Sequence, residues 1–191
     1  MSDAPRSAAI AYLLMFAGVG LFVPYFPLWL EQVVGVPGQQ IVVLFLVGGL
    51  VNVVAGPWAG RLSDRVGRRP LIFASCVLFA LLMAAVPYAV RGLVSATAFF
   101  SASMLSVAMR IAPLQSLVSA LVPAQERGMM MSGAVALGQI GMASGAGVAG
   151  MLYGRFGMQG NTLAGAVALL AMAYVVGVHL PEPTADVPEP A

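Results

Sequence analysis

Apolar residues run in long blocks along this chain, and short polar or glycine- and proline-rich segments separate them. The blocks cover approximately residues 8–30, 39–59, 70–89, 93–120, 129–152 and 160–180. Each block is close to the roughly 20 residues that an α-helix needs to cross the hydrocarbon core of a bilayer. The pattern therefore predicts an all-α polytopic membrane protein with six transmembrane helices.

The composition agrees with lipid as the main solvent. Hydrophobic residues make up 60% of the 191 positions and charged residues 8%, whereas about 25% of residues are charged in a typical soluble domain. The net charge of +2 is too small to predict a nucleic-acid partner. The chain has one cysteine and one histidine, and it holds no phosphate loop, paired catalytic carboxylates or nucleophile–base pair. We therefore expect a lipid bilayer as the surroundings, with no metal, no cofactor and no enzymatic activity.

The basic residues, all of them arginines, orient the predicted helices. With the amino terminus in the cytoplasm, the inner side holds Arg6, Arg61, Arg65, Arg68, Arg69 and Arg127, and the outer side holds Arg91 and Arg155. Because cytoplasmic loops are enriched in arginine and lysine, we expect both termini in the cytoplasm and the protein in the cytoplasmic (inner) membrane.

The chain then divides into three parts. These are a cytoplasmic N-terminus at 1–7, the six-helix bundle at 8–180 and a disordered, acidic cytoplasmic tail at 181–191. The first apolar block exceeds the roughly 7–15 apolar residues of a signal peptide. We therefore expect it to be a retained helix.

An internal repeat is visible in the polar links. The pattern Ala-Gly-x-Leu-x-x-Arg-x-Gly occupies residues 59–67 and again residues 149–157. Each copy falls at the same link of a three-helix unit, and an odd number of helices per unit inverts one unit relative to the other. Inverted three-helix repeats are typical of transporters. The alternative is chance similarity between two glycine-rich helix ends.

Charged residues gather in one turn between the second and third blocks, at residues 60–70. Gly67 permits the left-handed backbone that ends a helix, and Pro70 suits the first turn of the next helix. Asp64 suits the positive N-terminal end of a helix. The arginines of this turn can bind helix-end carbonyls or anionic lipid headgroups. The simplest interpretation is a basic turn that sets the orientation of the chain.

Residues 60–69, Gly-Arg-Leu-Ser-Asp-Arg-Val-Gly-Arg-Arg, resemble the signature loop of the major facilitator superfamily, Gly-x-Leu-Ala-Asp-Arg-x-Gly-Arg-Arg/Lys. Only Ser63 departs from the pattern, and the loop joins the second and third helices as it does in that family. The resemblance covers nearly the whole chain and implies one six-helix half of the transporter fold, similar to an N-terminal half. It also implies a gate in which the aspartate contacts a helix of the other half. The implied gating residues are Gly60, Asp64, Arg65, Gly67, Arg68 and Arg69.

Two further stretches resemble the family. Residues 123–128, Pro-Ala-Gln-Glu-Arg-Gly, are similar to its Pro-x-x-x-Arg-Gly link between helices 4 and 5. Residues 23–30 are similar to the end of helix 1 in lactose-permease-like and aromatic-acid symporters. Tyr25 in this stretch is a candidate for the substrate path, although an interfacial aromatic belt with Trp29 is the simpler interpretation. Pro24 and Pro27 are expected to kink this helix end.

The fifth block is rich in small residues. Three of its glycines coincide with glycines of the antiporter motif of drug exporters, but Ala146 stands where that motif has proline. Gly141 and Gly145 also have the small-x-x-x-small spacing that lets two helices approach closely. The resemblance implies that this helix faces the other half of the transporter. The predicted packing or interface residues are Gly141, Gly145, Gly150, Glu126 and Arg127.

Arg110 is the charged residue that lies deepest within a predicted span. If its helix continues to about residue 121, Arg110 lies roughly 16 Å from the inner end at 1.5 Å per residue, near the middle of the bilayer. A charge there costs about 2.5–3.5 kcal/mol on insertion scales, so it is expected to face a cavity or a partner. Alternatively, Pro113 breaks the helix and Arg110 reaches toward the inner surface. The other polar candidates for the substrate path, each with a helix–helix hydrogen bond as its alternative, are Asn52, Gln115 and Gln139.

These features predict transport of a small solute by alternating access. Since the family's transport path lies between two six-helix halves, the resemblance implies a homodimer or a second six-helix half as the partner. Helices 1 and 4 would line the path and helices 2 and 5 would form the interface, with Asp64 of one copy meeting the start of helix 5 of the other.

Two other functions stay open at this point. One is a non-transporting membrane protein that keeps the bundle as an interaction or assembly module. The other is a fragment of a 12-helix transporter. The sequence also leaves the substrate, the direction of transport and the coupling ion undetermined, because the first helix resembles symporters and the fifth resembles exporters.

Overall fold

The computed structural model describes residues 4–119, 123 and 125–180, and the regular elements of this part are all helices. The elements are α1 (Ala4–Phe22), α2 (Tyr25–Trp29), the π-helix η1 (Leu30–Val34), α3 (Gly38–Val66), α4 (Arg68–Ala89), α5 (Leu93–Ser119) and α6 (Arg127–His179). The predicted tail at 181–191 lies outside the described residues. The prediction of an all-α protein is confirmed for the described part.

Five segments of the described chain are long and apolar enough to cross a membrane. They are Arg6–Val34, Gly38–Val66, Arg68–Ala89, Leu93–Ser119 and Arg127–His179. The first four match the first four predicted spans to within a few residues at most ends. The last covers the fifth and sixth predicted spans together.

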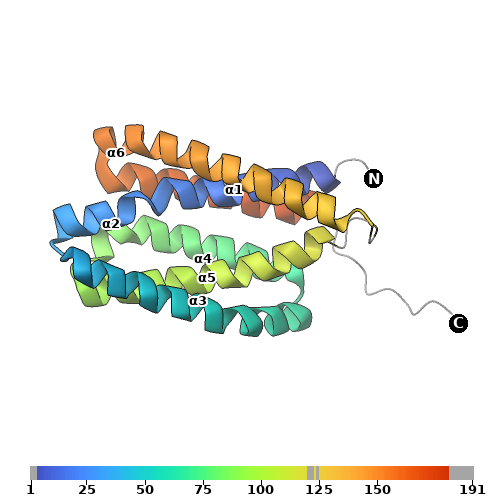
Figure 1. The fold of residues 1–191 in the computed structure, drawn as a ribbon, viewed down its shortest axis with the longest axis horizontal. Helices are drawn as coiled ribbons and strands as arrows, with labels where there is room; N and C mark the ends of the chain where they lie inside the picture. Colours follow the sequence, from blue (N-terminus) through green and yellow to red (C-terminus); the bar gives the residue numbers. More distant parts are fainter. Residues whose placement is uncertain (1–3, 120–122, 124, 181–191) are drawn as a thin grey trace, which may run out of the picture.

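The helices run side by side along the long axis of the molecule (Figure 1). α1 packs along α6, and α3 packs along α5. α4 joins these two pairs, because it packs against both α5 and α6. The start of α1, the turn between α3 and α4 and the start of α6 lie at the same end of the bundle (Figure 1). The segments that the sequence assigns to the cytoplasmic side therefore share one end.

α6 is too long to cross a bilayer once. A straight helix of its 53 residues would extend about 80 Å at 1.5 Å per residue, whereas the hydrocarbon core is about 30 Å thick. The backbone leaves helical geometry at Gly157, where φ is 62° and ψ is −157°, and Figure 1 shows α6 turning back on itself. α6 thus consists of two arms, residues 127–156 and 158–179. A single glycine separates them, instead of the longer gap that the sequence predicted.

Gly67 and Gly157 share an unusual backbone conformation, with positive φ angles of 98° and 62°. Each closes one copy of the internal repeat predicted at residues 59–67 and 149–157. Each also separates two helical segments, since Gly67 lies between α3 and α4. A side chain is strained at such φ angles, because its Cβ crowds the backbone. The repeat therefore places a glycine where the chain reverses.

Replacing Gly157 with alanine is expected to lower the free energy of unfolding by about 1–3 kcal/mol, the usual cost of a strained backbone residue. An added Cβ there would meet no atom within 4 Å, so the loss would come from the backbone alone. Gly154→Ala is the control, because Gly154 is helical and equally unobstructed and alanine favours helix. Thermal unfolding of both variants in one detergent checks this; equal midpoints would contradict it.

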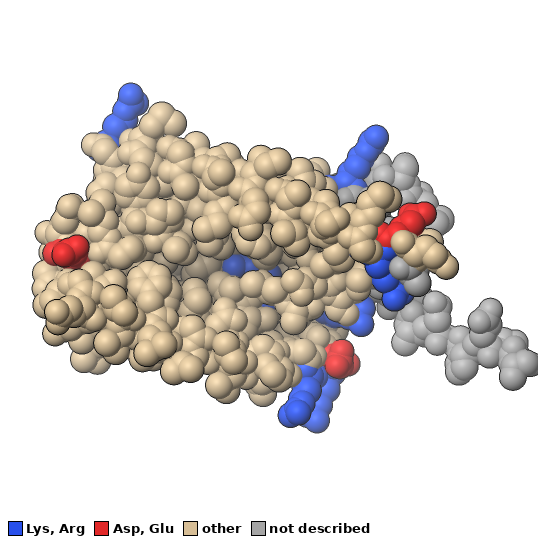
Figure 2. Space-filling view, in the orientation of Figure 1, with Lys and Arg blue, Asp and Glu red and all other residues tan. Residues whose placement is uncertain are grey.

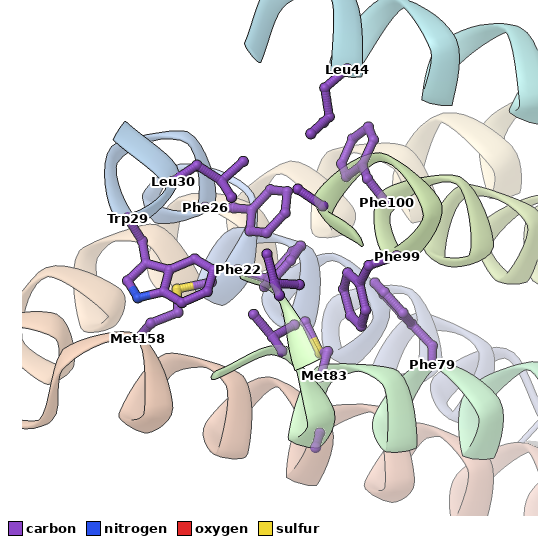
Figure 3. Close-up of a cluster of buried hydrophobic side chains, with 14 of the residues drawn as sticks. Phe22, Phe26, Trp29, Leu30, Leu44, Phe79, Met83, Phe99, Phe100 and Met158 are labelled. Atoms are coloured by element: carbon purple, nitrogen blue, oxygen red, sulfur yellow. The ribbon is translucent and has the colours of Figure 1, made fainter. Parts of the chain in front are cut away.

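Buried side chains form two clusters inside the bundle. The aromatic cluster includes Phe22, Phe26, Trp29, Phe79, Met83, Phe99 and Phe100 (Figure 3). The second cluster, here called the inner cluster, includes Ala8, Tyr12, Met15, Cys76, Leu114 and Met172. Both draw residues from α1, α4, α5 and α6, so they hold the two helix pairs together.

The end of the first span contributes to the aromatic cluster. α1 ends at Phe22 and α2 begins after Pro24, so the helix is interrupted where the prolines predicted a kink. Trp29 is 7% exposed, and its ring centroid lies 6.4 Å from that of Phe26. The interpretation of Trp29 as part of an interfacial belt is therefore wrong. Tyr25 is half-buried, and its ring centroid lies 5.0 Å from that of Tyr153.

Candidate functional site

Arg110 lies inside the bundle, on α5. This helix continues through Pro113, and Arg110 is 0% exposed. The alternative in which proline breaks the helix and the arginine reaches the surface is therefore wrong. Nε, Nη1 and Nη2 of Arg110 are all buried, and none of them has a hydrogen-bond acceptor among the described residues.

Arg110 lies where the two buried clusters meet. Its guanidinium carbon is 5.3 Å from the centre of the Phe79 ring, which belongs to the aromatic cluster. The Cys76 thiol of the inner cluster lies beside the same guanidinium. Phe79 and Cys76 are three residues apart and therefore share one face of α4. A cation over an aromatic ring gains about 0.5–2 kcal/mol, but this contact leaves the N–H donors of the guanidinium unpaired.

The space-filling view shows how the charges are distributed. Basic and acidic atoms gather mainly at the two ends of the molecule, and the surface between them is largely uncharged (Figure 2). Basic atoms also show at mid-length, at the bottom of a hollow on the displayed face (Figure 2). The interior charge is thus separated from the charged ends by apolar surface.

The predicted gating loop lies at the end of the bundle that carries the start of α1. Asp64 and Arg65 occupy the last turn of α3 and are exposed, so within this chain Asp64 lies at the C-terminal end of a helix and not at an N-terminal end as expected. Gly60 lies one turn earlier, and its carbonyl accepts a hydrogen bond of 2.7 Å from Ser63 Oγ. Gly67 ends the helix, and its N–H donates to the Ser63 carbonyl. Ser63, the residue that departs from the family pattern, therefore bonds to the backbone of its own helix, near the end of α3.

Arg68 and Arg69 begin α4 and are both half-buried. Nη2 of Arg69 donates a hydrogen bond to the carbonyl of Gly177 in the last turn of α6. Carbonyls at a helix C-terminus lack helical partners and carry partial negative charge. Arg69 therefore fastens the loop to the end of α6 within the same chain.

The other polar candidates are not brought together with Arg110. Nδ2 of Asn52 lies 3.9 Å from Sδ of Met104, which joins α3 to α5 as a helix–helix contact. Gln115 and Gln139 are exposed.

Glu126 caps the start of α6 through its backbone but forms no side-chain cap hydrogen bond, and both Glu126 and Arg127 are exposed. No three His, Cys, Asp or Glu side chains of the described chain gather as metal ligands would.

The predicted packing glycines face α1 and α2 of the same chain. A Cβ added to Gly141 would overlap the carbonyl oxygen of Leu13, and one added to Gly145 would overlap that of Ala17. A Cβ on Gly150 would fall 2.8 Å from the Tyr25 hydroxyl. Gly141 and Gly145 therefore let α1 and the first arm of α6 approach backbone to backbone, and this face of α6 is already covered.

Residues 8–191 match the family model described as Major Facilitator Superfamily. The chain belongs to the major facilitator superfamily. It is therefore a multi-pass membrane protein, in agreement with the long apolar helices of the structure.

Two curated relatives are similar to part of the chain. Identity with the tetracycline resistance protein, class B, of Escherichia coli is 32% over 79 residues, which covers 40% of this chain and 20% of the relative. Identity with the quinolone resistance protein NorA of Staphylococcus aureus is 30% over 66 residues, which covers 35% of this chain and 17% of the relative. The matched part of this superfamily member thus spans a fifth or less of the length of these curated relatives.

Three buried features of this superfamily member were not predicted. The Tyr12 hydroxyl and the side-chain amide of Asn161 are buried without hydrogen-bond partners in the described chain, and Phe79 lies beneath Arg110. Asn161 carried a usable signal, because an amide in the sixth predicted span is as unusual as the three amides that were singled out. Phe79 carried none, since apolar residues fill the whole third span.

Proposed function

We propose that this member of the superfamily moves a small solute across the membrane by alternating access. The observation that carries the proposal is the match of residues 8–191 to the superfamily. Two relatives are named for resistance to tetracycline and to quinolones, which favours a small organic molecule as the solute. In this proposal both termini lie in the cytoplasm, because arginines are more frequent at that end of the bundle.

The two arms of α6 cross the membrane separately in this proposal, giving six spans. Each arm exceeds the roughly 20 residues that a span needs. The positive φ angles of Gly67 and Gly157 support an inverted repeat, since both glycines lie at the same link of a three-helix unit. One bundle would then form one half of a transport path.

A second six-helix bundle completes the path, either as another copy or as a different half. α3 is the least buried of the five candidate spans, and its exposed side lines an apolar groove of about 650 Å³ together with Leu105 of α5. Gln139 is exposed on the first arm of α6, and a polar side chain in a span usually faces protein or a water-filled cavity. We assign α3 and this arm to the interface, and α1 and α5 to the path.

Cross-linking tests this arrangement for a homodimer. In a Cys76→Ala background, Asp64→Cys combined with Gly128→Cys should form a disulfide between two copies, because Asp64 would meet the start of α6 of the partner. In the matched control, Arg91→Cys combined with Gly128→Cys, the two cysteines lie at opposite ends of the bundle. This variant should therefore give only monomer. Non-reducing electrophoresis of membranes provides the readout. Native mass determination in lipid gives the oligomeric state. A strictly monomeric protein would exclude the homodimer, and a different six-helix half would then be the partner.

Asp64→Asn is expected to slow solute flux about tenfold or more, since a hydrogen bond to a charged group contributes about 1.5–3 kcal/mol and about 1.4 kcal/mol corresponds to tenfold. Flux of tetracycline or a quinolone into vesicles containing the assembled protein provides the measurement. Glu31→Gln is the control, because Glu31 is equally exposed but lies at the opposite end. Unchanged flux in Asp64→Asn would remove the gating role, and no flux from a proven assembly would favour an assembly module instead.

A further inference from the structure

Arg110 is a buried cation whose counter-charge does not come from the described chain. The residue is 0% exposed, and none of its guanidinium nitrogens finds an acceptor there. The acidic residues of the described part are Glu31, Asp64 and Glu126, all exposed and located at or next to helix ends. The negative charge that neutralises Arg110 must therefore come from elsewhere.

The chemistry of the guanidinium defines the anion that fits it. Its N–H donors form a planar fork that matches the two oxygens of a carboxylate through parallel hydrogen bonds. The Phe79 ring attracts the positive charge of the guanidinium but accepts no hydrogen bond from these donors. Apolar surroundings strengthen such charge-assisted hydrogen bonds, since little water competes for them. A carboxylate is thus the group that satisfies both the charge and the donors.

The surroundings define the rest of the ligand. Phe79 contacts Phe22, with ring centroids 6.4 Å apart, and Met83 lies in the same cluster (Figure 3). Cys76, which also lies beside the guanidinium, belongs to the inner cluster, which is mostly apolar. One cation among apolar side chains suits a ligand with one negative charge and an apolar body. The hollow at mid-length, with basic atoms at its bottom, offers a route from the displayed face (Figure 2).

We propose that Arg110 binds the carboxylate of a small apolar monocarboxylate, whose apolar body packs where the aromatic and inner clusters meet. This inference rests on the proposed transport function, in which such a compound is the solute. It names the charge and the class of the solute, which the superfamily match leaves open.

Cys76 provides a native reporter for this site. It is the only cysteine of the chain, is buried and lies beside Arg110. Purified protein in lipid nanodiscs is treated with N-ethylmaleimide, and intact mass follows alkylation over time. Benzoate is the probe, and benzamide is the matched neutral control. Benzoate at ten times its dissociation constant should slow alkylation about tenfold, because roughly a tenth of the sites then stay empty.

The variants separate charge recognition from shape. Arg110→Gln should lose the protection by benzoate, while Arg110→Lys should keep part of it, because an ammonium retains the charge but not the fork. If Cys76 does not react, thermal unfolding of the same samples decides, since benzoate should raise the midpoint of the wild type but not of Arg110→Gln. Equal effects of benzoate and benzamide, or full protection in Arg110→Gln, would overturn the proposal. No effect of benzoate in either measurement would also overturn it and favour a carboxylate side chain of a second bundle.

Binding and transport fail in distinguishable ways. Protection by benzoate without flux into vesicles would support the site and contradict transport. Equal solute flux in the wild type and in Arg110→Gln, with no protection of Cys76 by benzoate, would support transport and contradict the site.

Discussion

Replacing Arg110 with methionine is expected to raise the thermal unfolding midpoint of the purified protein and to abolish solute flux. Arg110 is 0% exposed and has no hydrogen-bond acceptor in the described chain. Replacing even a paired buried charge with apolar residues of similar volume is often neutral or stabilising by about 1–4 kcal/mol, and a buried charge without a partner is more costly still. For a chain of this size, about 1 kcal/mol corresponds to a shift of about 2–4 °C. The same change removes the positive charge that we assign to binding the carboxylate of the solute.

The opposite behaviour of stability and activity is what makes this substitution informative. A residue kept only for packing would lose stability when changed, and a residue kept for binding would gain it. Arg155→Met is the control, because Arg155 is exposed and surface substitutions usually stay within about 0.5 kcal/mol. Midpoints are compared in the same detergent without added carboxylate. A lower midpoint for Arg110→Met would show that Arg110 is satisfied within the folded protein, contrary to our interpretation.

Replacing Gly145 with alanine is expected to destabilise the bundle by about 1–3 kcal/mol, the usual cost of overpacking. The added methyl group would overlap the carbonyl oxygen of Ala17 in α1. A backbone atom cannot rotate away as a side-chain end can, so the two helices would have to separate. Gly141 faces Leu13 in the same way, and the two substitutions together should therefore prevent close packing of α1 on α6.

Gly147→Ala is the matched control for this prediction. Gly147 lies half a turn from Gly145 in the same helix, and a Cβ there would meet no atom within 4 Å. Since alanine favours helix over glycine by up to about 1 kcal/mol, the control should keep or slightly raise the unfolding midpoint. Equal midpoints for Gly145→Ala and Gly147→Ala would contradict the close approach of the two backbones.

Several predictions from the sequence hold because they depend on local chemistry. Apolar block length predicts helices long enough for a bilayer, and helices cover nearly all of the described residues of these blocks. Gly67 was expected to end a helix, and its φ of 98° agrees. The signature loop at 60–69 indicated the family that the match over residues 8–191 shows. Each of these features needs only neighbouring residues to be interpreted.

Other features depend on contacts between distant segments, and the sequence left them undecided or misled. Trp29 was assigned to the membrane interface, yet it packs on Phe26 and is almost fully buried. The amphipathic character of tryptophan is the same in both places, so composition could not separate them. Arg69 was known only to suit a helix-end carbonyl, and the fold selected that of Gly177, 108 residues away.

The sequence by itself determined that this protein is a bundle of membrane-spanning helices with a superfamily signature loop, because block length and a local motif carry that information. Only the tertiary structure decided where Arg110 lies. The sequence allowed either a helix broken at Pro113 or a continuous one, and these place the guanidinium at the surface or in the interior. Which of the two positions the guanidinium takes depends on how α4 packs against α5. This packing places Phe79 and Cys76 beside Arg110. Such packing joins residues more than 30 positions apart, and no local pattern specifies it.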